Sequence, residues 1–142
     1  MRLNRSTDIS LRILMLSAVR DDRLTIDELA EVLAVPRHHL AKVVQRLQHL
    51  GLLETVRGRS GGVRLAGIAH TASIGGLVRK LEGDTEVVDC EGEQACPLSR
   101  DCLLRGALRR AQEAFYATLD PITVGDLIAP PARQVLLSLG RR

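Results

Sequence analysis

Aromatic residues are almost absent from this chain. Its 142 residues include one Phe, one Tyr and no Trp. This scarcity disfavours the class of proteins that bind single-stranded nucleic acid by stacking bases on exposed aromatic rings. The apolar fraction is nevertheless 45%, so we expect an ordered protein with an aliphatic core rather than a disordered chain.

Long apolar runs are also missing. No stretch approaches the ~20 apolar residues that a membrane span needs. The basic N-terminal residues are not followed by the apolar segment of a signal peptide. We therefore expect a cytoplasmic protein without a membrane partner. Its length predicts one ordinary domain, or one compact head with an appended helix.

Cysteine is scarce and confined to one short acidic stretch. Cys90, Cys96 and Cys102 are each separated from the next by five residues. An odd number of cysteines in a reducing compartment indicates metal or redox chemistry rather than a disulfide framework. The five-residue gaps differ from the C-x-x-C pairs of most structural zinc sites and from common ferredoxin spacings. Because thiolates are the preferred ligands of iron–sulfur clusters, the spacing favours such a cluster. Structural thiols and a zinc site completed by Asp, Glu or His remain alternatives.

Charge is unevenly distributed along the sequence. Residues 36–65 carry six basic residues against Glu54 alone. Residues 82–101 carry seven acidic residues against Arg100. The basic segment and the acidic cysteine loop therefore predict two separate functional sites.

Hydrophobic periodicity predicts a mainly α-helical protein with a small β-hairpin. We expect helices over 7–19, 25–33, 36–50, 73–82, 103–119 and 124–128, with Ser6 or Thr7 capping the first. The hairpin is predicted over 53–65, around the glycine-rich turn 58–62. Residues 66–72 are expected to form a loop, and the tail after Pro131 to be frayed or helical.

The order of helix, break, helix and glycine-tipped hairpin is typical of a winged helix-turn-helix. The 36–50 helix would then lie in the major groove of DNA, and the hairpin would contact phosphate or the narrower groove. The alternative is that these charges only solvate the surface. The predicted DNA-binding residues are Arg37, His38, His39, Lys42, Gln45 and Arg46 on the helix, and Arg57, Arg59, Ser60 and Arg64 on the wing.

The chain resembles the winged-helix Rrf-type family of transcriptional regulators over about residues 1–129. The resemblance is carried by residues 1–3, the helix segment 39–47, the wing run 54–65, the cysteine triplet and residues 122–127. Within this family the run 102–108 is of the kind found in nitric-oxide-sensing members. Another kind of family member carries a histidine ligand shortly after the third cysteine. This chain differs from that kind, because its residues 103–109 contain no His.

The resemblance implies a homodimer that binds palindromic operator DNA and is paired through the 103–119 helix. It implies a 4Fe–4S cluster ligated by Cys90, Cys96 and Cys102, with 2Fe–2S as the alternative. Asp8 is the implied fourth ligand, reaching across the dimer. Other candidates for that ligand are Asp89, Glu91, Glu93, Asp101 and His70. The implied regions are 1–68 for the DNA-binding head, 69–129 for the cluster loop and dimerisation helix, and 130–142 for the tail.

The resemblance implies a repressor that senses nitric oxide. Nitrosylation or loss of the cluster would release the operator and derepress nitric-oxide detoxification genes. Sensing of iron, cluster supply or redox state by the same fold is the first alternative. An electron-transfer protein would have no use for a winged helix, and a zinc enzyme would need a motif such as H-E-x-x-H, which the sequence lacks. We therefore do not expect an enzyme.

Overall fold

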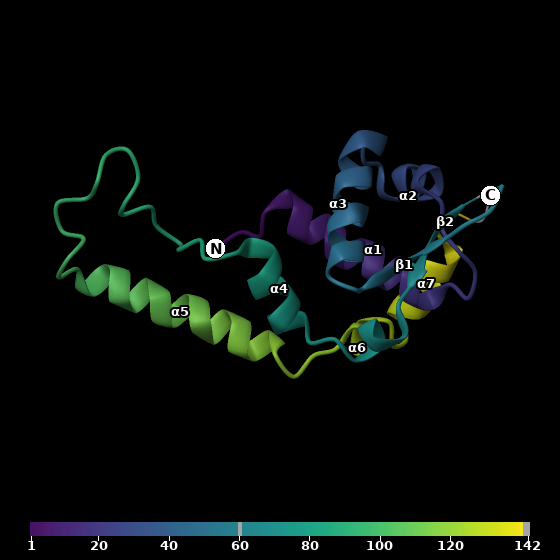
Figure 1. The fold of residues 1–142 in the computed structure, drawn as a ribbon. Coiled ribbons are helices and arrows are strands. Elements are labelled where there is room, and N and C mark those ends of the chain that lie inside the picture. The colour runs from purple at the N-terminus through teal and green to yellow at the C-terminus, as the bar shows by residue number, and fades with distance from the viewer. Residues whose placement is uncertain (60, 141–142) are drawn as a thin grey trace.

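The computed structural model describes residues 1–59 and 61–140. A helical head carries a two-stranded hairpin at one side, and on the other side the long helix α5 begins at the cysteine loop and packs against α4 (Figure 1). The elements in chain order are α1 (Arg5–Val19), α2 (Ile26–Leu33), α3 (Arg37–His49), β1 (Leu53–Val56), β2 (Gly62–Leu65), the 3-10 helix η1 (Gly67–Thr71), α4 (Ile74–Glu82), α5 (Leu103–Leu119), α6 (Val124–Leu127) and α7 (Ala132–Ser138).

The first helix begins two residues earlier than its hydrophobic pattern predicts. The side chain of Asn4, not that of Ser6 or Thr7, accepts a hydrogen bond from the Thr7 N–H at 2.8 Å. Asn is among the best N-cap residues because its amide oxygen satisfies a free helical donor. This cap places Asp8 in the first turn of α1, as predicted.

The helix-turn-helix is formed by α2 and α3. Thr25 and Glu28 form the predicted capping box at the start of α2. The helix then ends at Ala34, which adopts the left-handed conformation with a φ of 51°. Glycine usually occupies such a position, because a Cβ there costs about 1 kcal/mol. Pro36 then precedes α3, where its fixed φ suits a helix start.

The C-terminus of α3 is closed by a Schellman motif. Gly51 has a φ of 72°, its N–H donates to the carbonyl of Gln48, and the Leu52 N–H donates to the carbonyl of Leu47. This is the arrangement in which glycine is favoured after a helix end. It turns the chain directly from α3 into the wing.

The wing is an antiparallel hairpin in which Leu53 pairs with Leu65 and Val56 pairs with Gly62. A third segment joins it, because Leu24 and Val63 exchange both backbone hydrogen bonds at 2.8 Å. A Cβ on Gly62 would lie only 3.0 Å from the Leu24 carbonyl carbon. Glycine at this position therefore allows the wing to lie against the chain that enters α2.

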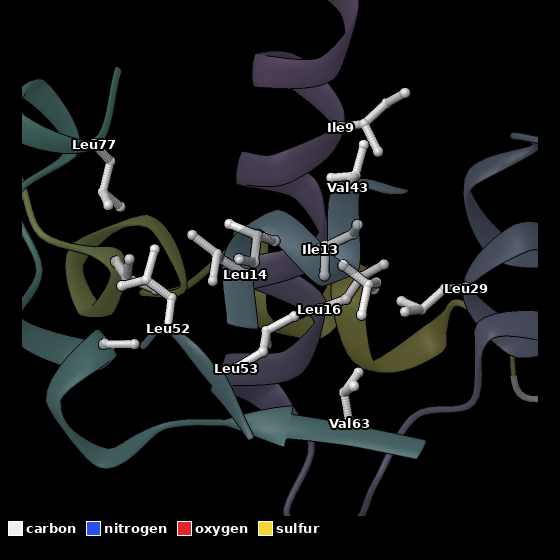
Figure 2. Packing of buried hydrophobic residues seen from close by; sticks show 14 of the residues in the cluster. Ile9, Ile13, Leu14, Leu16, Leu29, Val43, Leu52, Leu53, Val63 and Leu77 are labelled. Carbon is white, nitrogen blue, oxygen red and sulfur yellow. The ribbon is translucent and has the colours of Figure 1, made fainter. Parts of the chain in front are cut away.

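The core is aliphatic and centred on α1. Ile13 and Leu14 are fully buried, and side chains from α3, α4, the hairpin and the chain before it converge on them (Figure 2). The single tyrosine, Tyr116 of α5, joins this cluster from the far side of α4. Among the described helices none is both long enough and apolar enough to cross a membrane.

The C-terminal segments close over α1. Helices α6 and α7 both contact α1, and Leu136 of α7 packs against the core. The Arg20 side chain donates to the Leu139 carbonyl at 2.9 Å. The tail after Pro131 is thus helical over most of its length, and it covers the head.

Candidate functional site

Part of the predicted DNA-binding surface borders one groove. Helix α3 and the wing border a cavity of roughly 810 Å³, with Arg37 and Gln48 on the helix side and Arg57 and Arg59 on the wing side. The Gln48 side chain crosses to the Thr55 hydroxyl at 2.6 Å. Arg37 of the helix and Arg57 and Arg59 of the wing therefore border the same groove.

Several side chains of this surface are exposed and make no hydrogen bond or ion pair within the described part of the chain. They are His38, Lys42, Gln45, Arg57 and Arg59. Arg and Gln can make bidentate contacts to base edges, whereas Lys more often binds phosphate. These residues are available for both kinds of contact.

Three other predicted residues have partners inside the chain. Arg37 pairs with Asp27 at 2.5 Å and Arg64 with Glu54 at 3.0 Å, and all four side chains are exposed. His39 Nε2 lies 3.3 Å from the Ser6 hydroxyl. Exposed ion pairs of this kind are weak, so these arginines can exchange a carboxylate for a phosphate at little cost. Ser60 lies outside the described residues.

Arg46 differs from its neighbours on α3. One terminal nitrogen of its guanidinium donates to the carbonyls of Lys80 and Leu81, each at 3.0 Å. This side chain is therefore directed toward the C-terminus of α4.

The cysteine loop is held together by its own backbone. The Cys96 N–H donates to the Cys90 carbonyl at 3.1 Å, and the Ser99 N–H donates to the Cys96 carbonyl at 3.1 Å. Cys102 is the N-cap of α5, where its Sγ accepts the Arg105 N–H at 3.4 Å.

The three thiols are half-buried and influence one another electrostatically. Burial raises the pKa of the Cys90 thiol, Arg105 lowers it, and the neighbouring Cys96, Cys102 and Glu86 raise it further. Gathering thiolates beside a carboxylate therefore needs compensating positive charge, which a metal centre supplies on binding.

The loop does not preform a site for one ion. In residues 1–59 and 61–140, no group of three or more His, Cys, Asp or Glu side chains converges tightly enough to hold a single metal ion. An iron–sulfur cluster spreads its cysteine ligands over separate irons, so it requires a wider arrangement. Three cysteine thiols on one short loop are of the ligand type that iron–sulfur clusters use.

Arg105 is the residue that sequence reasoning missed. Its guanidinium makes two hydrogen bonds to Glu86, at 2.8 and 2.9 Å, and a third to Glu91 at 3.0 Å. A further, longer contact reaches the Ser99 carbonyl at 3.5 Å. Only 17% of its side chain is exposed. Arg105 thus fastens the loop on both sides of Cys90 to the first turn of α5. Its position three residues after Cys102, directly behind the acidic loop, was the available signal.

Asp8 lies on a different part of the molecule. It pairs with Arg12 at 2.8 Å, and 47% of its side chain is exposed. Figure 1 shows α1 apart from the tip of the cysteine loop in the same chain. The structure therefore does not bring Asp8 together with the three cysteines of its own chain.

A family model described as "Rrf2: Iron-dependent Transcriptional regulator" matches residues 3–130. The chain belongs to the Rrf2 family. This match covers the head, the wing, the cysteine loop and α5 together. The expected family and the mainly helical winged fold are thereby confirmed.

The Rrf2 relatives with curated names include repressors. The chain is 56% identical to the HTH-type transcriptional repressor NsrR of Streptomyces coelicolor, over 100% of this chain and 98% of the relative. It is 41% identical to the HTH-type transcriptional regulator NsrR of Bacillus subtilis, over 90% of both chains. The protein is accordingly a transcriptional regulator of the NsrR kind.

Solved Rrf2-type structures share the fold. CymR of B. subtilis, the global cysteine regulator, has a TM-score of 0.67 at 22% identity, covering 94% of this chain and 98% of that one. IscR of T. potens has a TM-score of 0.69 at 18% identity, covering 90% and 86% respectively. At these identities the likeness concerns the arrangement of helices and wing.

Proposed function

We propose that this protein is an iron–sulfur-containing repressor that senses nitric oxide and releases palindromic operator DNA in response. Derepression of nitric-oxide detoxification genes would follow. The observation that carries the proposal is a winged head joined to a three-cysteine loop, in a chain 56% identical over its whole length to a repressor named NsrR. The protein acts by binding DNA, and we propose no catalytic activity.

A 4Fe–4S cluster is the proposed cofactor. Cys90, Cys96 and Cys102 would hold three irons, and Asp8 of the partner subunit would hold the fourth. An exposed carboxylate in the first turn of α1 is accessible to a second chain. The bound cluster would supply an oxygen-ligated iron, which is the more accessible point for attack by a small molecule. Without a histidine in 103–109, the 2Fe–2S alternative lacks a ready fourth ligand.

A homodimer would bring the parts together. Helix α5 exposes apolar side chains on the face that does not pack on α4: Leu104 is 65% exposed and Phe115 is 37% exposed. Pairing two chains through this face would bury the stripe and hold two α3 helices at a fixed separation. A palindromic operator is the DNA that matches such two-fold symmetry.

Loss of the cofactor would change how the cysteine loop is connected to α1. The three cysteines and Asp8 would no longer be joined through a shared cofactor. Because Asp8 lies on α1, and α1 contacts α3 and the wing strand β2, its release can alter the position of the reading surface. The change in the free energy of operator binding cannot exceed the difference in the free energy of cofactor binding between the two head positions.

Iron supply is a second candidate signal, because the matching family model is described as iron-dependent. The same residues would then report whether the loop is filled. Nitric oxide and iron supply differ in whether an intact, filled protein responds to nitric oxide alone.

The decisive experiment titrates anaerobically purified protein with nitric oxide while absorbance and operator binding are followed together. We expect visible absorbance to change and operator to be released at the same stoichiometry. Release on iron chelation but not on nitric oxide would support the iron-supply alternative. A colourless, zinc-containing protein that binds operator regardless would overturn the cluster proposal.

A further inference from the structure

The C-terminus of α4 is capped by a side chain from α3, the helix that is predicted to enter the major groove. The last carbonyls of any helix lack intrahelical partners. Arg46 of α3 supplies a donor to two of them, those of Lys80 and Leu81. It also places a positive charge at the negative end of the α4 dipole.

The same turn of α4 borders the other functional parts. The Glu82 carboxylate accepts the Asn4 N–H at 3.0 Å, just ahead of the α1 turn that contains Asp8. Gly83 then ends α4 with a φ of 70°, and the chain enters the cysteine loop. Within three further residues it reaches Glu86, which Arg105 holds against α5. The end of α4 is thus in contact with α3 and the N-terminus and continuous with the cysteine loop.

We infer that Arg46 is a positioning residue that couples the cysteine loop to the reading helix, rather than a residue that reads DNA. A shift of the loop would move the end of α4, and the Arg46 contact would carry that shift to α3. The inference rests on the proposed function, because it needs a loop whose state changes. It also requires that the contact differ in strength between the two states, since otherwise no coupling results.

The test uses Arg46→Ala and Arg46→Lys, with Arg59→Ala of the wing as the comparator for a phosphate contact. Operator affinity is measured for each variant in its cluster-loaded and cluster-free forms at several salt concentrations. In Arg46→Ala we expect the ratio of the two affinities to shrink by about 5-fold or more, as loss of a typical coupling would produce. Its salt dependence should stay unchanged, and Arg46→Lys should recover part of the ratio.

Arg59→Ala should behave in the opposite way. Loss of a phosphate contact weakens both forms equally and lowers the salt slope by about 1. If Arg46→Ala shows that same pattern, Arg46 is a DNA contact and the inference is wrong. An unchanged ratio with unchanged affinity would also overturn it, because the contact would then serve only to hold α4. The absorbance of the loaded cluster should be the same in Arg46→Ala and in the parent.

Hydrogen exchange of DNA-free protein separates this inference from the proposed function. In the parent, removing the cluster should speed amide exchange in α3, whereas in Arg46→Ala the α3 amides should exchange alike in both forms. An α3 that ignores cluster removal in the parent would overturn the coupling even if operator binding is cluster-dependent. A parent that binds operator equally in both forms would overturn the proposed function, whatever the exchange shows.

Discussion

Arg105 shows how one side chain can order an otherwise irregular loop. Its planar fork holds Glu86 with two bonds and Glu91 with a third, and burial keeps it in place. Arginine suits this role better than lysine, because its donors are fixed in a plane that matches carboxylates. Arg105 therefore holds the segments on both sides of Cys90 against the start of α5.

We predict that Arg105→Ala lowers the affinity of the loop for its cofactor by about 10-fold or more, as loss of an outer-sphere support does at other metal sites. Reconstituted protein should contain less iron and show altered visible absorbance. Arg110→Ala is the matched control, since this arginine is exposed on the same helix. Equal iron content in both variants would show that Arg105 does not support the loop.

Glu28 gives a prediction about pH. The Thr25 N–H is the main cause that lowers the pKa of this carboxyl below its ordinary value of 4.5, burial opposes it, and the Thr25 hydroxyl lowers it further. A lowered folded-state pKa adds stability that is present above pH 4.5 and is lost as pH falls through the folded value.

Glu28→Gln should therefore reduce the stability of cluster-free protein at pH 7 by only about a few tenths of a kcal/mol, because the group is largely exposed and screened. The difference from the parent should shrink as pH falls below 4.5. Thermal unfolding at pH 7 and pH 3 measures this, with Glu31→Gln of the same helix as the control. A difference that is undiminished at pH 3 would mean that the charge is not its source.

At the scale of elements, the packing of α4 on α5 depends on one glycine. A Cβ on Gly75 would lie 2.6 Å from both the Tyr116 carbonyl oxygen and the Asp120 nitrogen. At Gly76 the nearest atom to such a Cβ is the Ser73 hydroxyl at 3.6 Å. The close approach of α5 therefore requires a glycine at position 75, whereas no such contact constrains position 76.

We predict that Gly75→Ala destabilises the protein, since backbone atoms of α5 would have to move. Gly76→Ala should stabilise it by about 0.8–1 kcal/mol, the gain in helix propensity. Chemical denaturation of the two variants measures both signs. If both variants are stabilised, α5 can shift away from α4 freely, and the close contact is not structurally required.

The helices themselves follow from the sequence, because their apolar residues recur at helical spacing and their caps lie nearby. Contacts between distant segments do not. The pairing of Leu24 with Val63 depends on where the wing lies, and the 3-10 turn Gly67–Thr71 has no clear periodicity. Ala34 adopts the left-handed conformation, which the presence of an alanine does not predict.

For the candidate site too, local features could be predicted from the sequence but contacts between distant segments could not. Spacing singled out the three cysteines, and charge singled out the basic face of α3 and the wing. A helical pattern says which face a side chain occupies but not which partner it meets. The contact of Arg46 with α4 and the clamp of Arg105 on Glu86 both join segments far apart in sequence. The roles assigned to individual DNA-binding and cluster-binding residues remain predictions.

At the scale of the whole molecule, the exposed apolar face of α5 calls for a second chain. We predict that Phe115→Glu converts a dimer into a monomer and weakens operator binding at least to the level of one half-site. Light scattering coupled to size-exclusion chromatography gives the mass. Ala117→Glu is the control, because this exposed residue points away from the stripe on the same helix. A monomeric parent protein, or an unaffected Phe115→Glu, would contradict the prediction.

Helix α1 is enclosed by segments from the whole length of the chain: α2, α3, β2, α4, α6 and α7 all contact it. The surface of α1 is therefore fully covered only when α6 and α7, much later in the chain, have joined it. Until residues 124–138 emerge, an apolar side of α1 stays open to chaperones and to other nascent chains. A chain that lacks α6 and α7 therefore leaves this side of α1 uncovered.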